Sequence, residues 1–152
     1  MQNYDFRPAE PSDAKAIHEL IVQSITQLGV LDHQHCAQTL SDLCLAVEVD
    51  DIAESIADGD TVWLAVQQQA ICGVATMDRH GEILHFYVSP LHSGQNLGRA
   101  LLAAVQLSAR EQGLSHIMLA TTHSARGFFR GQGFIPTRPD FAEWLEKPLQ
   151  QH

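Results

Sequence analysis

The chain has 152 residues, of which 45 % are hydrophobic and 18 % charged, and its formal net charge is −9 at pH 7. This composition is typical of a globular protein with one core of ordinary size, and it excludes a disordered chain. The acidic balance disfavours nucleic acid as a partner, because neutralising phosphates requires clustered lysine and arginine side chains.

The three cysteines form no CxxC pair, which disfavours a disulfide framework or a structural zinc site and favours a cytoplasmic location. No apolar run approaches the ~20 residues of a membrane-spanning helix, and the polar start lacks a signal-peptide pattern, so we expect no membrane partner. His33 and His35 would lie on different helix faces, so we expect no shared metal ion.

The first part of the chain predicts a strand followed by helices. Aromatic residues alternate in residues 4–8, which predicts a short strand. Residues 10–29 predict a helix with Pro11 in its first turn and Gly29 at its end. Its apolar residues recur at helical spacing: Ile17, Leu20, Ile21, Ile25 and Leu28. Residues 30–60 predict one or two further helices with polar outer faces.

The second part changes to short apolar runs. Residues 61–69 and 70–78 predict a hairpin, and "GEILHFYVSP" predicts a third strand after a turn at His80 and Gly81. We expect a helix from about Asn96 to Gln112 and a strand over 114–122. A short helix over 124–133 and two last strand segments, 134–139 and 141–149, follow. This order predicts one α/β domain with a mixed sheet covered by helices.

The turn "SGQNLG" joins the third of these strands to a helix. Unpaired amides at a helix N-terminus attract anions, and small or glycine residues let a phosphate approach the backbone closely. Arg99 adds a positive charge at the helix start. The turn has neither a P-loop G-K-[ST] nor a G-x-G-x-x-G after the first strand. We therefore expect a phosphate site of another kind here.

"GEILHFYVSPLHSGQNLGRALLAA", a strand, and then "ARGFFRGQGF" together resemble the GNAT superfamily of N-acetyltransferases, in particular small bacterial members of unassigned acceptor. The resemblance implies an α/β fold with a mixed, mostly antiparallel sheet of about six to seven strands flanked by helices. It implies one domain over 1–152: an acceptor-side half (1–78), an acetyl-CoA-binding core (79–135) and a C-terminal strand region (136–152). A homodimer is a further expectation from the resemblance.

The resemblance implies acetyl-CoA as co-substrate and no metal. The residues expected to bind acetyl-CoA are Phe86, Tyr87, Val88, Ser93, Gly94, Gln95, Asn96, Leu97, Gly98, Arg99, Thr122, Arg126 and Phe129. Four of them depart from the family pattern. Ser93 stands where the family has arginine, Asn96 where it has glycine, Thr122 where it often has asparagine, and Phe129 where it often has a general-acid tyrosine.

Acetyl transfer to an amine requires a neutral nucleophile, and a nearby base can provide one. The candidates are Glu82 at the start of the third strand of this region, His85 within it, and His123 at the late helix; each also has a purely structural reading. The leaving thiolate also needs a proton. Tyr87 is the phenol nearest in sequence that could act as this general acid, but strand alternation points it away from the side of Phe86.

The expected activity is acetyl transfer to a primary amine of a small molecule or a protein. Residues 1–78 hold 13 acidic residues and only two basic ones, Arg7 and Lys15, which favours a cationic acceptor. The alternative is a GNAT-fold protein that binds an acyl-CoA as a sensor and transfers it weakly. The departures at Ser93, Asn96 and Phe129 favour that alternative.

Overall fold

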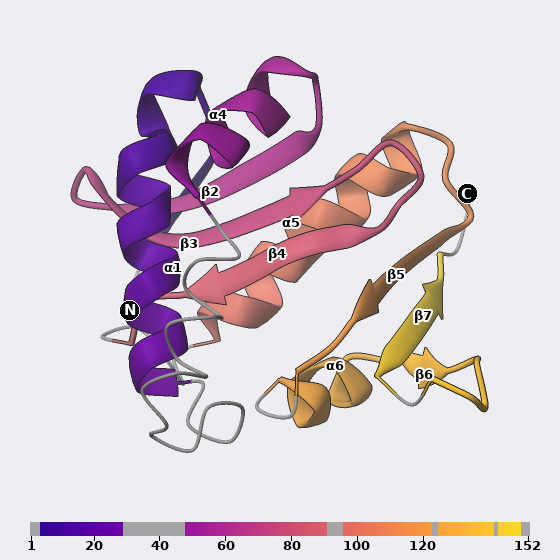
Figure 1. Ribbon diagram of the computed structural model, residues 1–152. Coiled ribbons are helices and arrows are strands. Elements are labelled where there is room, and N and C mark those ends of the chain that lie inside the picture. Colours follow the sequence, from indigo (N-terminus) through magenta and orange to yellow (C-terminus); the bar gives the residue numbers. More distant parts are fainter. Residues whose placement is uncertain (1–3, 29–47, 91–95, 123–124, 142, 150–152) are drawn as a thin grey trace.

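The computed structural model describes residues 4–28, 48–90, 96–122, 125–141 and 143–149 (Figure 1). They form two sheets, one with strand order β1-β2-β3-β4 and one with order β5-β7-β6, and neighbouring strands within each sheet are antiparallel. The elements are β1 (Asp5–Pro8), η1 (Pro11–Asp13), α1 (Ala14–Leu28), α4 (Val49–Ala57), β2 (Thr61–Gln67), β3 (Ala70–Met77), β4 (Ile83–Val88), α5 (Leu97–Glu111), β5 (His116–Ala120), α6 (Arg126–Gly131), β6 (Ile135–Pro136) and β7 (Trp144–Pro148).

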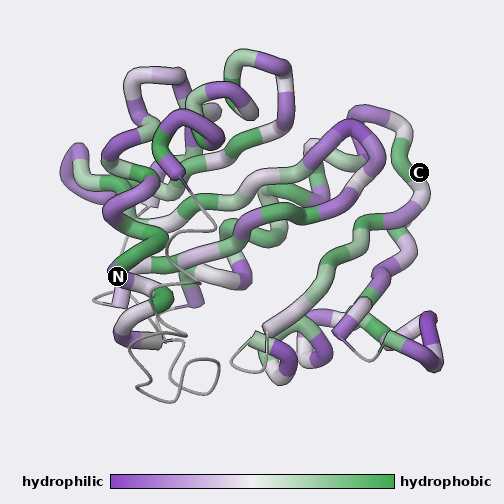
Figure 2. The backbone as a smooth tube through the Cα atoms, viewed as in Figure 1, coloured by the Kyte–Doolittle hydropathy of each residue, from purple (hydrophilic) through white to green (hydrophobic). Residues whose placement is uncertain are grey.

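Helices cover both faces of the first sheet, with α1 and α4 on one face and α5 on the other (Figure 1). On the first face, Ile17 and Ile21 of α1 pack with Leu64 and Val74 of the sheet. On the other face, the apolar side of α5 packs against Ala75 and Met77 of β3 and against residues of the second sheet; its buried core residues are Leu101, Leu102, Val105 and Ala109. Hydrophilic residues gather in the turns between strands (Figure 2).

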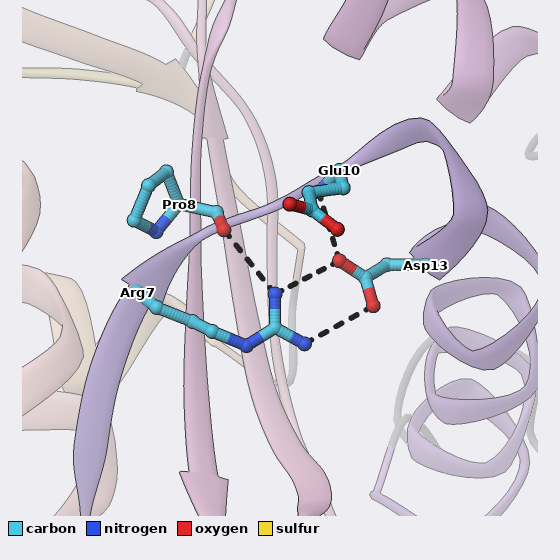
Figure 3. Close-up of polar contacts among 4 residues, drawn as sticks. All are labelled: Arg7, Pro8, Glu10 and Asp13. Atoms are coloured by element: carbon cyan, nitrogen blue, oxygen red, sulfur yellow. Dashed lines mark hydrogen bonds and ion pairs between the residues drawn. The ribbon is translucent and has the colours of Figure 1, made fainter.

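The start of α1 is tied to the first strand by an arginine. Arg7 in β1 donates two hydrogen bonds to the carboxylate of Asp13, at 2.9 and 3.1 Å (Figure 3). Asp13 also accepts the backbone N–H of Glu10 at 2.8 Å, as in a capping box. The hydrogen bond from Arg7 lowers the pKa of Asp13 and raises that of Arg7 itself. These contacts set the direction in which the chain enters α1.

The expected α/β fold is confirmed, and the predicted elements recur with small shifts. The helix expected from about Asn96 to Gln112 is α5, capped at those two residues, and Gly113 follows with φ +78°. Of the helices expected in residues 30–60, α4 is described; residues 29–47, with His33 and His35, lie outside the described residues. The strand expected over 134–139 forms only β6. Within the described ranges, no helix is long and apolar enough to cross a membrane.

Candidate active site

The two sheets meet at one point and then separate. The N–H of Met118 donates to the carbonyl of Gly81 at 3.0 Å, and Glu82 and Met118 form a single parallel bridge. Beyond this bridge, β4 continues beside β3 and β5 continues beside β7, so the parallel strands β4 and β5 diverge (Figure 1). In the described part of the chain no strand pairs with β4 on the side facing β5 after Glu82. We call this divergence the β4–β5 fork.

A glycine makes the closed end of the fork possible. Gly81 has φ +96°, a conformation that L side chains rarely adopt. A Cβ at this position would lie 2.7 Å from the backbone carbonyl oxygen of His116, closer than real Cβ atoms come. The sheets can therefore approach to hydrogen-bonding distance only with glycine here.

The backbone of β4 turns polar groups into the fork. Ser89 donates its N–H to the carbonyl of Cys72 at 2.8 Å, and the register pairs Tyr87 with Val74. In an antiparallel ladder, every second residue directs both its N–H and its C=O toward the partner strand. Tyr87 and Ser89 therefore face β3, whereas the N–H and C=O groups of Phe86 and Val88 point into the fork.

An irregularity at Leu84 sets which side chains lie on each face of β4. Thr76 pairs with His85 and Met77 with Ile83, which leaves Leu84 as an extra residue in β4, a β-bulge. Ile83 and Phe86 consequently both contact the core beneath α5.

His85 and Tyr87 lie on the opposite face of β4, the face that α1 covers. Tyr87 packs with the core residues of α1, and its ring centroid lies 6.4 Å from that of His85. Burial lowers the pKa of His85, so its imidazole is the neutral, proton-accepting form at pH 7. The side chains of Phe86 and Tyr87 thus point to opposite faces, as the alternation predicted.

The N-terminus of α5 lies close to the fork. Asn96 caps the helix with φ +63°, the left-handed region that asparagine adopts more readily than most residues. The first backbone N–H groups of a helix have no acceptor within it and attract anions. Gly98 lies in this first turn, where an added Cβ would come within 3.2 Å of the Phe128 ring and 3.9 Å of the Phe86 ring. The N-terminal turn of α5 therefore meets β4 and α6 at Gly98.

The remaining expected cofactor residues occupy several environments. Leu97 is fully buried, Arg99 is exposed, and Phe129 is buried among other phenyl rings. Thr122 caps the turn into α6 by accepting the N–H of Ala125 at 3.2 Å. These are contacts within the fold, so a contact with acetyl-CoA stays a prediction for each of them.

Arg126 lies at the start of α6. Its guanidinium lies 4.0 Å from the carboxylate of Glu143, and its Nε is buried with no hydrogen-bond partner among the residues that the structure describes. Its expected contact with acetyl-CoA also stays a prediction. Ser93, Gly94, Gln95 and His123 lie outside the described residues.

The two described candidates for the base differ in position. Glu82 lies at the closed end of the fork, where its N–H donates to Asp78 and its carbonyl accepts the N–H of Asp78. His85 directly precedes Phe86, whose amide points into the fork. With ~3.3 Å per strand residue, Glu82 starts four residues, or about 13 Å, from Phe86. The two candidates thus differ in their place along β4, and the role of each as the base stays a prediction.

Sequence reasoning missed two features of this site. Gly81 had the signal of a turn, but its close approach to His116 joins residues 35 positions apart and leaves no local pattern. Phe128 and Phe129 form the Phe-Phe pair of the family-like segment, but the pair does not indicate which of the two rings contacts Gly98; in the structure it is Phe128.

Solved structures show the class of fold. A GCN5-related N-acetyltransferase from Rhodopseudomonas palustris superposes with a TM-score of 0.85, at 22 % identity over 98 % of both chains. The PaiA N-acetyltransferase from Thermoplasma acidophilum, solved in complex with coenzyme A, superposes with a TM-score of 0.83, at 14 % identity over 97 % of this chain and 99 % of that one. The fold is therefore that of the GNAT N-acetyltransferases.

Sequence comparison identifies the family. The acetyltransferase (GNAT) domain model matches residues 19–144, so the chain belongs to the GNAT acetyltransferase family. Human N-acetyltransferase 8B is 27 % identical over 114 residues, which are 66 % of this chain and 50 % of that protein. The IAA acetyltransferase of Azospirillum brasilense is 34 % identical over 91 residues, 51 % of this chain and 60 % of that one. The chain thus spans about half of these relatives.

Proposed function

We propose that this GNAT acetyltransferase transfers an acetyl group from acetyl-CoA to a primary amine at the β4–β5 fork. The observation that supports it is the pair of backbone N–H groups, those of Phe86 and Val88, that point into the fork beside the N-terminus of α5. A carbonyl oxygen can accept from such an amide, and fixed donors stabilise the negative charge that develops on it during acyl transfer. The N–H groups of the first turn of α5, which have no acceptor within the helix, suit the pyrophosphate of the same molecule.

The donors and the proton acceptor lie on different sides of β4. The amine nitrogen attacks the thioester carbonyl carbon, a C–N bond forms, the C–S bond breaks, and the sulfur leaves as a thiolate. His85 lies on the face covered by α1 and accepts the proton that the amine loses. The rings of Phe86, Phe128 and Phe129 on the other face have no proton to donate, so water protonates the thiolate.

The acceptor that we propose is a cationic amine. The residues of α4 and its ends carry exposed carboxylates on the same face of the sheet as α1, namely those of Glu48, Asp50, Asp51, Glu54 and Asp58. Such a field raises the local concentration of cations, and salt screens it. Turnover of polyamine-like acceptors that falls with added salt would support this class; turnover of neutral or anionic amines alone, insensitive to salt, would contradict it.

Calorimetric titration with acetyl-CoA, with ATP and NAD as controls, tests the first step. The sharpest variant is Val88→Pro, which removes a fork-facing N–H without removing a hydrogen bond to β3. Val88→Ala is its matched control, because it loses the side chain and keeps the N–H. We expect saturable binding of acetyl-CoA alone, lost in Val88→Pro and retained in Val88→Ala. Absence of binding at millimolar acetyl-CoA would refute the proposal.

Release of free thiol from acetyl-CoA with an amine panel tests the second step. His85→Gln is expected to bind acetyl-CoA as the wild type does and to lose most of its turnover. Binding without thiol release for any amine would instead support the alternative, an acyl-CoA-binding protein with weak transfer.

A further inference from the structure

Phenyl rings from both sides of the β4–β5 fork meet beneath it. The ring of Phe86, from β4, lies 5.8 Å from that of Phe128 and 5.3 Å from that of Phe129, both from α6. Phe128 and Phe129 lie 5.1 Å apart, and Phe134 lies 5.4 Å beyond Phe129. Because β4 belongs to the first sheet and α6 connects β5 to β6 of the second, these contacts span the fork on the face that α5 and α6 cover. The cluster therefore gives this side of the fork an apolar floor.

Phe128 differs from its neighbours in this cluster. Phe129 and Phe134 are buried, at 4 % and 1 % exposure, whereas Phe128 remains partly exposed. Its ring stacks on Phe86 at an interplanar angle of 28°. On another side it packs so closely on Gly98 that an added Cβ would lie 3.2 Å from two ring carbons. The ring thus borders the fork and is held in place from two directions.

We propose that Phe128 determines the length of the acyl chain that the enzyme accepts, restricting it to acetyl and other short groups. This inference rests on the proposed function, in which the thioester carbonyl binds the fork amides of Phe86 and Val88. The acyl carbons next to that carbonyl then lie within reach of the phenyl floor. A methyl group packs favourably on it, but a longer chain needs the volume that the Phe128 ring occupies. One methylene in an apolar pocket changes selectivity by ~10–200-fold.

The test compares acetyl-CoA, butyryl-CoA and hexanoyl-CoA on the wild type and on Phe128→Ala. The readouts are kcat/KM from thiol release with one amine and the dissociation constant of each acyl-CoA. We expect the ratio of kcat/KM for hexanoyl-CoA to kcat/KM for acetyl-CoA to be at least about tenfold higher in Phe128→Ala than in the wild type. Phe128→Leu is expected to raise this ratio by a smaller factor. It provides the test if the alanine variant folds poorly.

Phe134→Leu is the matched control. It removes another ring of the same cluster, one that is fully buried and contacts Phe129. Its selectivity ratio is expected to equal that of the wild type, even though it loses stability. An equal rise in Phe134→Leu would refute the assignment to Phe128.

The outcomes separate this inference from the proposed function. Binding and turnover of acetyl-CoA with an unchanged chain-length ratio in folded Phe128 variants would overturn this inference alone. A wild type that prefers hexanoyl-CoA would do the same. A wild type that binds none of the three acyl-CoA molecules would overturn the proposed function and this inference with it.

Discussion

Replacing Gly81 by alanine is expected to weaken the junction at which the two sheets meet. A non-glycine residue at a φ such as +96° costs about 1–3 kcal/mol. The new Cβ would also lie 2.7 Å from the carbonyl oxygen of His116, so the backbone must move. That movement weakens the 3.0 Å hydrogen bond from Met118 to Gly81, which contributes about 0.5–1.5 kcal/mol. The free energy of unfolding should fall by about 2–4 kcal/mol.

Gly59→Ala provides the matched control for this prediction. Gly59 has φ +91°, almost that of Gly81, but an added Cβ there would have no atom of the described residues within 4 Å. It therefore tests the backbone cost without the clash. For a chain of this size, 1 kcal/mol corresponds to about 2–4 °C in Tm. The Tm of Gly81→Ala should lie at least about 2–4 °C below that of Gly59→Ala, and its free energy of unfolding in urea should be at least about 1 kcal/mol lower.

Acetyl-CoA titration adds a functional readout. Because Gly81 sets where β4 and β5 begin to diverge, its alanine variant should bind acetyl-CoA more weakly, whereas Gly59→Ala should bind it as the wild type does. Equal stability losses in the two variants would refute the reasoning, since the clash with His116 would then contribute nothing.

Three further predictions concern protonation and a buried hydrogen bond. Burial lowers the pKa of His85, so the acid limb of the wild-type kcat/KM profile should lie below the ordinary ~6.5 and disappear in His85→Gln; an unchanged limb would contradict its role as base. Arg7 lowers the pKa of Asp13 in the folded state. The pair therefore stabilises the fold fully at pH values above ~3.9, the pKa of an unfolded aspartate, and this stabilisation is lost as the pH falls through the lower pKa of the folded state. Because the Arg7 side chain is 43 % exposed, Asp13→Asn should cost at most ~1 kcal/mol at pH 7, and its urea midpoint should converge with that of the wild type in acid; parallel curves would refute this. Trp63 donates to the buried hydroxyl of Ser108 at 2.6 Å, so Ser108→Ala should cost ~1–3 kcal/mol by leaving the indole N–H unpaired. The cost should be smaller in a Trp63→Phe background, and additive costs in chemical denaturation would contradict the pairing.

The sequence by itself determined most of the secondary structure and the family. The α5 helix could be placed to within one residue at each end, because its apolar spacing, its start at Asn96 and the glycine after its end are local signals. The hairpin of β2 and β3 and the short α6 followed from similar patterns. The turn before α5 indicated an anion site from its own composition, and Asn96 has the left-handed backbone that its residue type allows.

Only the tertiary structure decided how these elements form a site. The bridge between Glu82 and Met118, the bulge at Leu84 and the ring of Phe128 against Gly98 depend on pairings between segments far apart in the chain. Strand register and ring packing follow from the total core that the chain can bury, so no short stretch of sequence encodes them. That is why the sequence offered Glu82, His85 and His123 as candidates for the base without deciding among them, while the fold places Glu82 at the closed end of the fork and His85 on the face of β4 that α1 covers.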